Sequence, residues 1–308
     1  MTAPRIEDKI TTGALNLGFA AVGIAEVGPA ESDLVYQRWL GTRRAADLDY
    51  LRRQRELRKD PRNLLPEAKS VICVAARYPV HPQPGIGFAM YARGGDYHEV
   101  IRANLRRLAA LARQDVPSLK YRICVDSAPL FEREWAVRAG LGWIGRQGQV
   151  ISPVHGACLL LGELLVNVAL TPSDRMPNQC GDCWQCVEAC PANAIGEDGL
   201  LDARRCVAYL TIEHKGELPA EFQPIIGPSL FGCDRCAAVC PWNPKDEGQI
   251  MPELQPREVP TVGQILKMNE PAFRTRFKGT AVFRTGLERL QRNAALTLGA
   301  PNPKPEAG

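Results

Sequence analysis

Apolar and polar positions follow two different periods along the first 170 residues. Apolar residues spaced three or four apart indicate amphipathic helices, whereas short apolar runs between turn residues indicate strands. By this criterion helices are expected at residues 6–17, 32–40, 45–57, 96–114 and 129–139. Strands are expected at residues 19–25, 70–76, 120–125, 150–152 and 158–170. The alternation favours an α/β or α+β sheet domain for this part of the chain.

The strongest helical pattern is that of residues 96–114. Val100, Leu105 and Leu108 share one face there, and the arginines lie largely elsewhere. Residues 81–87 contain two prolines and two glycines and are expected to form a loop. A helical stripe returns near the end of the chain, at Leu287, Leu290, Ala294 and Leu298.

The composition is that of an ordinary globular protein: 45% of the 308 residues are hydrophobic and 23% are charged. No stretch approaches the roughly 20 apolar residues that a membrane helix needs. Residues 1–8 lack the basic and apolar segments of a secretory signal. We therefore expect no membrane association and a cytoplasmic location, where thiols stay reduced.

Positive charge is concentrated near the end of the chain. The formal net charge is +4, yet residues 271–308 alone carry seven basic and two acidic residues, a local net charge of +5. Such a segment suggests a polyanionic partner such as nucleic acid. A solvated helix face is the simpler alternative.

Seven of the eleven cysteines fall in two short runs that each end in a Cys-Pro pair. Residues 180–191 read C-x2-C-x2-C-x3-C-P, and residues 233–241 read C-x2-C-x3-C-P. In this spacing three thiolates of one turn bind a four-iron cluster, and the cysteine before the proline reaches a neighbouring cluster. Structural zinc and disulfide frameworks fit the spacing and the chain length less well. The runs therefore predict two [4Fe-4S] clusters and a role in electron transfer.

Two such clusters need eight ligands, and Cys206, between the runs, is inferred by count as the eighth. We assign one cluster to Cys180, Cys183, Cys186 and Cys240. We assign the other to Cys190, Cys206, Cys233 and Cys236. Cys73, Cys124 and Cys158 lie in apolar runs and are expected to be buried core thiols.

Motifs for other cofactors are incomplete. No G-x-G-x-x-G follows a predicted strand, so a dinucleotide site is unsupported. Asp96 and His98 match the first two positions of the D-x-H-x-x-G cobalamin motif, but Ile101 occupies the glycine position. Ligation of cobalt by this histidine therefore cannot be inferred.

Several further stretches carry a resemblance to a known family. They read DPR at 60–62, LPEAKSVI at 65–72, YARG at 91–94, DYH at 96–98, VDSAPL at 125–130 and ER at 132–133. Others read AGLGWIG at 139–145, LGE at 161–163 and YLTIEHKG at 209–216. In this order, and together with both cysteine runs, the chain resembles epoxyqueuosine reductase, which is related to reductive dehalogenases. The resemblance covers about residues 5 to 300.

The resemblance implies an activity and a second cofactor. It implies that cobalamin and two clusters reduce epoxyqueuosine to queuosine in the anticodon loop of tRNA. Electrons would come from a low-potential donor of the flavodoxin or ferredoxin type. It also makes Asp126 the proton donor, which is chemically reasonable if burial raises its pKa. From the residues alone, Asp126 could instead cap the helix expected near Pro129.

The resemblance also implies binding residues. Cobalamin contacts are expected from Arg58, Tyr97, Asp126, Gly145, Arg146, Gln147, Gly148 and Val150. Residues 145–148 read GRQG where the family usually has GKNT, so side-chain contacts there differ. Tyr209 and Asp234, beside cluster ligands, either line the passage between cobalt and iron or pack the module. Contacts to tRNA are expected from Lys215, Arg284, Arg289 and Arg292.

We expect three parts in one monomeric chain. Residues 1–172 would form the cobalamin-binding catalytic domain, 173–248 a ferredoxin-like module with two [4Fe-4S] clusters, and 249–308 a basic helical tail that contacts tRNA. Two alternatives remain. One is a reductive dehalogenase-like enzyme that acts on a small molecule, and the other is a non-catalytic ferredoxin-type electron carrier.

Overall fold

The computed structural model describes residues 5–79, 87–218, 220–246 and 248–298. Its centre is a four-stranded sheet with the order β1-β2-β6-β3, in which every neighbouring pair is antiparallel. The domain is therefore of the α+β kind, one of the two forms that the sequence predicted. The strands are β1 (Ala21–Glu26), β2 (Ser70–Arg77), β3 (Tyr121–Cys124) and β6 (Leu159–Val166).

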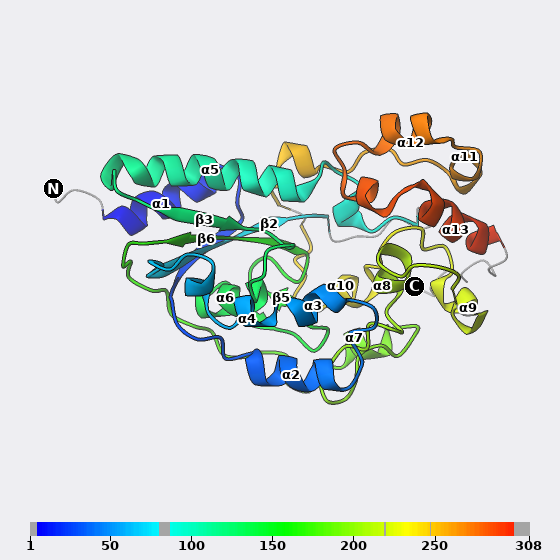
Figure 1. Cartoon of the computed structure of the whole chain (residues 1–308), viewed down its shortest axis with the longest axis horizontal. Coiled ribbons are helices and arrows are strands. Elements are labelled where there is room, and N and C mark those ends of the chain that lie inside the picture. The colour runs from blue at the N-terminus through cyan, green and yellow to red at the C-terminus, as the bar shows by residue number, and fades with distance from the viewer. Residues whose placement is uncertain (1–4, 80–86, 219, 247, 299–308) are drawn as a thin grey trace.

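Helices cover both faces of this sheet (Figure 1). β2 is buried along its whole length because its alternate residues face the two layers. Ile72 packs in one layer with Leu105, and Cys73 packs in the other with Trp135. The helices of the two layers are α1 (Ile6–Asn16) and α5 (Tyr97–Asp115) on one side and α6 (Glu132–Arg138) on the other.

Two predicted helices differ from the observed ones. The helix expected at 45–57 begins only at Asp49, because Ala46 has a φ of 51° and the chain turns irregularly until residue 48. It is then divided into two short helices at Gln54. The helix expected at 129–139 begins only at Glu132. The loop expected at 81–87 lies outside the described residues except for Gly87. The remaining elements of the first part are α2 (Asp33–Gly41), α3 (Asp49–Arg53), α4 (Arg55–Arg58), η1 (Pro61–Asn63), η2 (Met90–Ala92), β4 (Trp143–Ile144) and β5 (Val150–Ile151).

The cysteine-rich part contains only short helices joined by turns. They are α7 (Gln185–Glu188), α8 (Val207–Ile212), η3 (Ala220–Phe222), α9 (Gln223–Ile226) and α10 (Arg235–Ala238). Ala237 and Cys240 pack into the same hydrophobic core as Ile72. The cysteine-rich part is thus joined to the sheet domain through side-chain packing.

The last part is helical, as predicted, and it packs on both other parts. Its elements are η4 (Pro252–Leu254), α11 (Val262–Leu266), α12 (Glu270–Phe277), η5 (Ala281–Thr285) and α13 (Leu287–Leu298). Met251 and Leu254 join the core of the sheet domain. Asn293, which is fully buried, donates hydrogen bonds to the backbone oxygens of Thr211 at 2.9 Å and Leu230 at 2.8 Å. These bonds hold α13 against the cysteine-rich part.

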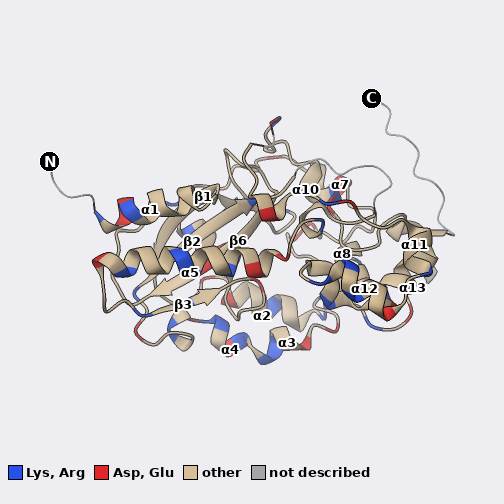
Figure 2. Cartoon of the chain, turned by 90° about the horizontal axis from the view of Figure 1, so that it is seen from above, with Lys and Arg blue, Asp and Glu red and all other residues tan. Residues whose placement is uncertain are grey.

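Two simpler expectations can be compared with the structure. Cys73, Cys124 and Cys158 are all buried, as predicted for core thiols. Among the described residues, no helix combines the length and the apolar character needed to cross a membrane. Figure 2 shows basic residues around α3 and α4 as well as around α12, so positive charge is not confined to the tail.

Candidate active site and iron–sulfur centres

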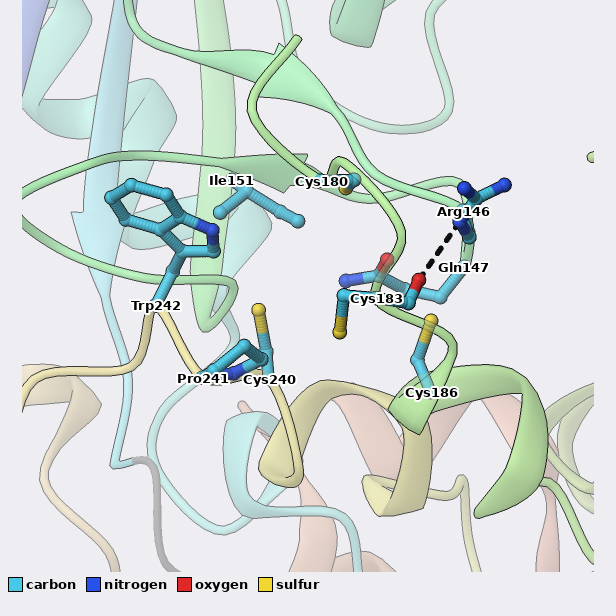
Figure 3. A pocket seen from close by; sticks show the side chains of 9 residues that line it. All are labelled: Arg146, Gln147, Ile151, Cys180, Cys183, Cys186, Cys240, Pro241 and Trp242. Carbon is cyan, nitrogen blue, oxygen red and sulfur yellow. Dashed lines mark hydrogen bonds between the residues drawn. The ribbon is translucent and has the colours of Figure 1, made fainter.

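The four cysteines assigned to the first cluster line one cavity (Figure 3). Cys180, Cys183, Cys186 and Cys240 share it with Ile151 and Trp242, among other residues. Four thiols from two distant runs around a single apolar space are the donor set that a [4Fe-4S] cluster requires. The side chains present therefore fit such a cluster.

Two residues of the β4–β5 region hold the loop that carries these cysteines. The indole N–H of buried Trp143 donates to the sulfur of Cys180, with an N–S distance of 3.4 Å. The guanidinium of Arg146 donates to the backbone oxygens of Cys183 at 2.9 Å and Gly181 at 2.7 Å. Donors near cluster sulfurs favour the reduced, more negative cluster.

The other four cysteines also lie together. Burial, followed by the charges of Cys233, Cys206 and Cys190, raises the pKa of Cys236 above its ordinary value. Burial likewise raises the pKa of Cys233 to about 11. Cys206 stands at the N-terminus of α8, within electrostatic reach of Cys190. This grouping is consistent with the predicted second ligand set.

Asp126 follows β3 and occupies an unusual backbone conformation. Its φ is 50°, which a non-glycine residue adopts only when its surroundings hold it there. Its backbone N–H donates to Oε1 of Glu132, and its Oδ2 lies 2.9 Å from Nε2 of His98. Since α6 begins at Glu132 with no side-chain cap, Asp126 is not the helix cap considered as an alternative.

His98 links Asp126 to a second carboxylate. Its Nδ1 lies 2.6 Å from Oδ1 of Asp96, and the ring is 4% exposed. Burial alone would lower the pKa of His98, but hydrogen bonds and charges from Asp126 and Asp96 outweigh it and raise that pKa. The imidazolium form can donate to both carboxylates at once.

The pKa of Asp126 differs from the sequence-based expectation. Burial would raise it, but the hydrogen bond and charge of His98, then the charge of Arg284, lower the pKa of Asp126 below its ordinary value. The expected rise through burial is therefore wrong. Arg284 Nη1 lies 2.8 Å from Nε2 of His98, close to the bond between His98 and Asp126. The directions of the two shifts favour the charged form of each group, an imidazolium beside a carboxylate.

Two residues predicted to contact cobalamin lie beside Asp126. Tyr97 stacks on His98 with ring centroids 4.0 Å apart and bonds to Asp126. Arg58 is buried and donates to the backbone oxygen of Leu130 at 2.8 Å, in the loop that follows Asp126. The Asp126 side chain itself is 52% exposed, so it faces open space in which substrate and cofactor would meet.

The loop at residues 145–150 lies against the first cysteine set. Arg146 and Gln147 line the cavity of Cys180, and Val150 is buried in the core with Trp135. A Cβ on Gly145 would come within 2.4 Å of Gln147, and Gly148 has a φ of 80°. The glycines thus serve the tight hairpin, and the cobalamin contacts expected from this loop stay a prediction.

Tyr209 and Asp234 occupy different surroundings. The hydroxyl of Tyr209 donates to Oδ2 of Asp47 at 3.1 Å, so this side chain joins α8 to the turn before α3. Asp234 accepts a hydrogen bond from the backbone N–H of Met90 at 2.8 Å, and burial raises the pKa of Asp234 to about 6. Both residues contribute to packing, and a position between cobalt and iron stays a prediction.

Some of the residues expected to bind tRNA are already engaged in hydrogen bonds within the chain. Arg292 donates to the backbone oxygens of Leu210 at 2.8 Å, His214 at 3.0 Å and Gly216 at 2.6 Å. Arg289 donates to the backbone oxygen of Ile212. Lys215 is exposed, and so is Arg284, despite its contact with His98. The guanidinium groups of α13 thus also stabilise the chain that follows α8.

Sequence reasoning missed three parts of this site. His98 was set aside with the incomplete cobalamin motif, although its position two residues after Asp96 indicated a local carboxylate partner. Glu132 lay in a quoted stretch, but no role was assigned to it. Trp143 lay in the quoted stretch 139–145 and was expected to pack in the core or against the corrin, but its hydrogen bond to Cys180 was not predicted. Their roles depend on contacts with residues distant in the sequence.

Comparisons with known proteins bear on the whole chain. Residues 179–243 match the family described as "4Fe-4S double cluster binding domain", and residues 58–127 match "Epoxyqueuosine reductase QueG, DUF1730". The epoxyqueuosine reductase of Vibrio cholerae is 35% identical over 97% of this chain and 84% of its own length. That of Escherichia coli is 36% identical over 96% of this chain and 81% of its own.

Solved structures of epoxyqueuosine reductases also match this chain over most of its length. An epoxyqueuosine reductase in complex with an epoxyqueuosine-modified stem loop of tyrosine tRNA has a TM-score of 0.84 and 29% identity, covering 95% of this chain and 80% of that chain. The Streptococcus thermophilus enzyme has a TM-score of 0.80 and 30% identity over 95% of this chain and 80% of its own. A Bacillus subtilis enzyme was solved with its catalytic aspartate loop swung out of the active site. It has a TM-score of 0.85 and 29% identity, covering 95% of this chain and 81% of its own.

Proposed function

The chain belongs to the epoxyqueuosine reductase family, and we propose that Asp126 and His98 form its proton-transfer pair. The enzyme reduces epoxyqueuosine to queuosine in tRNA. Two electrons and two protons are consumed when the epoxide becomes a carbon–carbon double bond and its oxygen leaves as water. The chain must therefore supply both electrons and protons to one carbon–oxygen site.

Electrons pass through the two clusters of the double-cluster domain. We assign the first to Cys180, Cys183, Cys186 and Cys240, on the evidence of their common cavity. The second falls to Cys190, Cys206, Cys233 and Cys236, whose thiols lie within electrostatic reach of one another. A low-potential donor of the flavodoxin or ferredoxin type would load them.

Cobalamin is the second cofactor in this proposal. It would supply a low-valent cobalt centre able to deliver electrons from the clusters to the epoxide. Tyr97 and Arg58 lie beside Asp126, at the open space that the Asp126 carboxyl faces. In this chain their task would be to shape that space and to hold the Asp126 loop.

Proton transfer rests on the 2.9 Å contact between His98 Nε2 and Asp126 Oδ2. Asp126 is exposed enough to meet the epoxide oxygen, and His98 is buried enough to keep its proton from bulk water. His98, which Asp96 stabilises as a cation, would pass its proton to Asp126, and Asp126 would deliver it to the epoxide oxygen. The second proton would come from solvent. The contact between His98 and Asp126 is the observation that carries the proposal.

We further propose how the chain binds tRNA and where it acts. A relative binds a tRNA stem loop, and in this proposal exposed Lys215 and Arg284 would contact the phosphates of the tRNA. An unstacked nucleotide would enter the space in front of Asp126. The enzyme would act as a cytoplasmic monomer. The dehalogenase and electron-carrier alternatives gain no support from the comparisons.

Anaerobic reconstitution with iron, sulfide and cobalamin provides the test. The loaded protein should convert an epoxyqueuosine-containing stem loop to the queuosine form, followed by mass spectrometry. Asp126→Asn should slow this conversion about 10²- to 10⁴-fold, the usual contribution of a general acid. Asp115→Asn, at a surface ion pair with Lys9, is the matched control. Conversion by Asp126→Asn at the wild-type rate would exclude the proton-transfer role.

A further inference from the structure

A pair of carboxyl groups lies behind Asp126, and the proposed function does not use it. Glu163, on the central strand β6, has no exposed surface, and neither of its carboxylate oxygens has a hydrogen-bond partner among the described residues when it is ionised. It pairs in register with Cys73 on β2 and Cys124 on β3. A buried carboxylate without donors is costly, so this group must take up a proton or share one.

Among the described residues, Glu132, at the first turn of α6, is the group placed to share a proton with Glu163. The two side chains lie within hydrogen-bonding reach of each other, and two carboxyls can form a hydrogen bond only if one of them is protonated. Glu132 in turn accepts the backbone N–H of Asp126. The three residues therefore form a chain of contacts from the centre of the sheet to the strained Asp126 backbone.

We propose that Glu132 and Glu163 form a carboxyl latch, in which one shared proton holds Glu132 against the Asp126 N–H and so positions the catalytic carboxyl. The inference rests on the proposed function, because it assigns a purpose to the conformation of Asp126. Glu132 and Glu163 are positioning residues, since they act on the reacting group through the backbone. A φ of 50° is uncommon for a non-glycine residue, and the hydrogen bond from the Asp126 N–H to Glu132 helps to hold it.

The charges around the latch are consistent with a retained proton. Burial first, and then the charge of Asp126, raise the pKa of Glu132 to about 7. Burial and the neighbouring carboxylates of Glu132 and Asp126 raise the pKa of Glu163 well above its ordinary value. Arg133 and Arg58 oppose the rise at Glu132. On the sheet side, Cys73 and Cys124 are neutral thiols, because burial raises their pKa values.

The latch should release as pH rises. Below neutral pH the pair holds at least one proton and the hydrogen bond persists. When the shared proton leaves, two adjacent buried carboxylates repel each other, Glu132 moves, and the Asp126 N–H loses its acceptor. The loop that carries Asp126 is then free to leave its active conformation.

Hydrogen exchange of the segment 124–131 in the fully loaded enzyme tests this directly. In the wild type the segment should be protected at about pH 6 and exchange faster, after correction for intrinsic rates, at about pH 9. Glu163→Gln keeps a donor for Glu132 without a proton to lose, so the segment should stay protected at both pH values. Glu163→Leu removes the donor, so exchange should be fast at both.

Turnover at neutral pH provides the second readout. Glu163→Leu should reduce it about tenfold to a hundredfold, the cost of a misplaced catalytic group, and Glu163→Gln should restore most of the loss. Glu134→Gln is the control, because buried Glu134 lies on the same helix but accepts from the N–H groups of Glu31 and Ser32. It should leave exchange at 124–131 unchanged.

Two results would overturn the latch: a wild-type pH response in Glu163→Gln, or a protected segment in Glu163→Leu. If the wild type itself shows no epoxyqueuosine turnover, the proposed function fails instead. The exchange comparison still decides whether the latch exists, because it requires no substrate. The two failures are therefore distinguishable.

Discussion

Replacement of His98 by asparagine should shift the alkaline limit of the reaction to lower pH. Burial opposes the charged form of His98, but Asp126 and Asp96 raise the pKa of His98 above its ordinary value of 6.5. The same contacts, against burial, lower the pKa of Asp126 below its ordinary value of 3.8. In the wild type the proton of the pair is therefore lost as pH rises through the raised His98 pKa.

The expected loss of rate in His98→Asn follows from which side chain can carry the proton. Asparagine cannot carry it, so Asp126 alone must hold it in the variant. The two ordinary values differ by 2.7 pKa units, which corresponds to an about 500-fold lower protonated fraction on the alkaline side, since each unit is a factor of ten. The raised pKa of His98 in the wild type adds to this difference. Loss of His98 also lets burial raise the pKa of Asp126, which offsets part of this. We expect a rate about 10²-fold lower at slightly alkaline pH.

The assay is single turnover of an epoxyqueuosine-containing stem loop by the loaded enzyme, with excess chemical reductant and quenching at several pH values. His155→Asn is the matched control, because this partly buried histidine lies outside the site and burial lowers its pKa. It should leave the pH profile unchanged. The reasoning is wrong if His98→Asn slows the reaction equally at every pH, since that would indicate a structural role only.

Three further predictions concern the clusters and the tail. Cys206→Ala should lower the iron content from about eight atoms per chain toward about four, whereas Cys73→Ala should not change it; equal iron in both would remove Cys206 from the ligand set. Trp143→Phe deletes the N–H donor 3.4 Å from the Cys180 sulfur, so redox titration followed by electron paramagnetic resonance should find a lower potential for one cluster; an unchanged potential would contradict this. Arg292→Gln removes bonds to three backbone oxygens and should lower the free energy of unfolding in urea by about 1–3 kcal/mol. Unchanged stability with weaker tRNA binding would instead favour the phosphate contact inferred from sequence.

The sheet and the cysteine sets were largely predictable because their patterns are local. The apolar run at 70–76 identifies β2, and the cysteine spacing alone gave the ligand set that shares one cavity. The break in the helix expected at 45–57 was not predictable, because no proline or glycine marks the turn at Ala46. In that segment the tertiary packing overrides helical propensity.

The proposed proton-transfer site could be predicted only in part from the sequence, for a different reason. A carboxylate after a strand can be recognised from sequence, but its ionisation depends on groups brought to it from other elements. Burial alone would raise the pKa of Asp126, but His98 from α5 and Arg284 from η5 reverse the sign of the net shift. Neither partner lies within 25 residues of Asp126 in the sequence, so no local pattern could indicate the reversal.

The carboxyls proposed to position Asp126 lie on a different side of it from the cysteine-rich part, and this separation has a physical reason. On the cysteine-rich side, Tyr91 lies within electrostatic reach of Cys206, Asp234 and Asp126, and its ring centroid is 5.8 Å from that of Tyr97. On the sheet side lie the buried carboxyls of Glu132 and Glu163. Negative charge near a four-iron cluster disfavours its reduction, because the added electron makes the cluster more negative. Carboxyls placed behind β6, and held partly protonated, can position the proton donor without opposing the electrons that the reaction consumes.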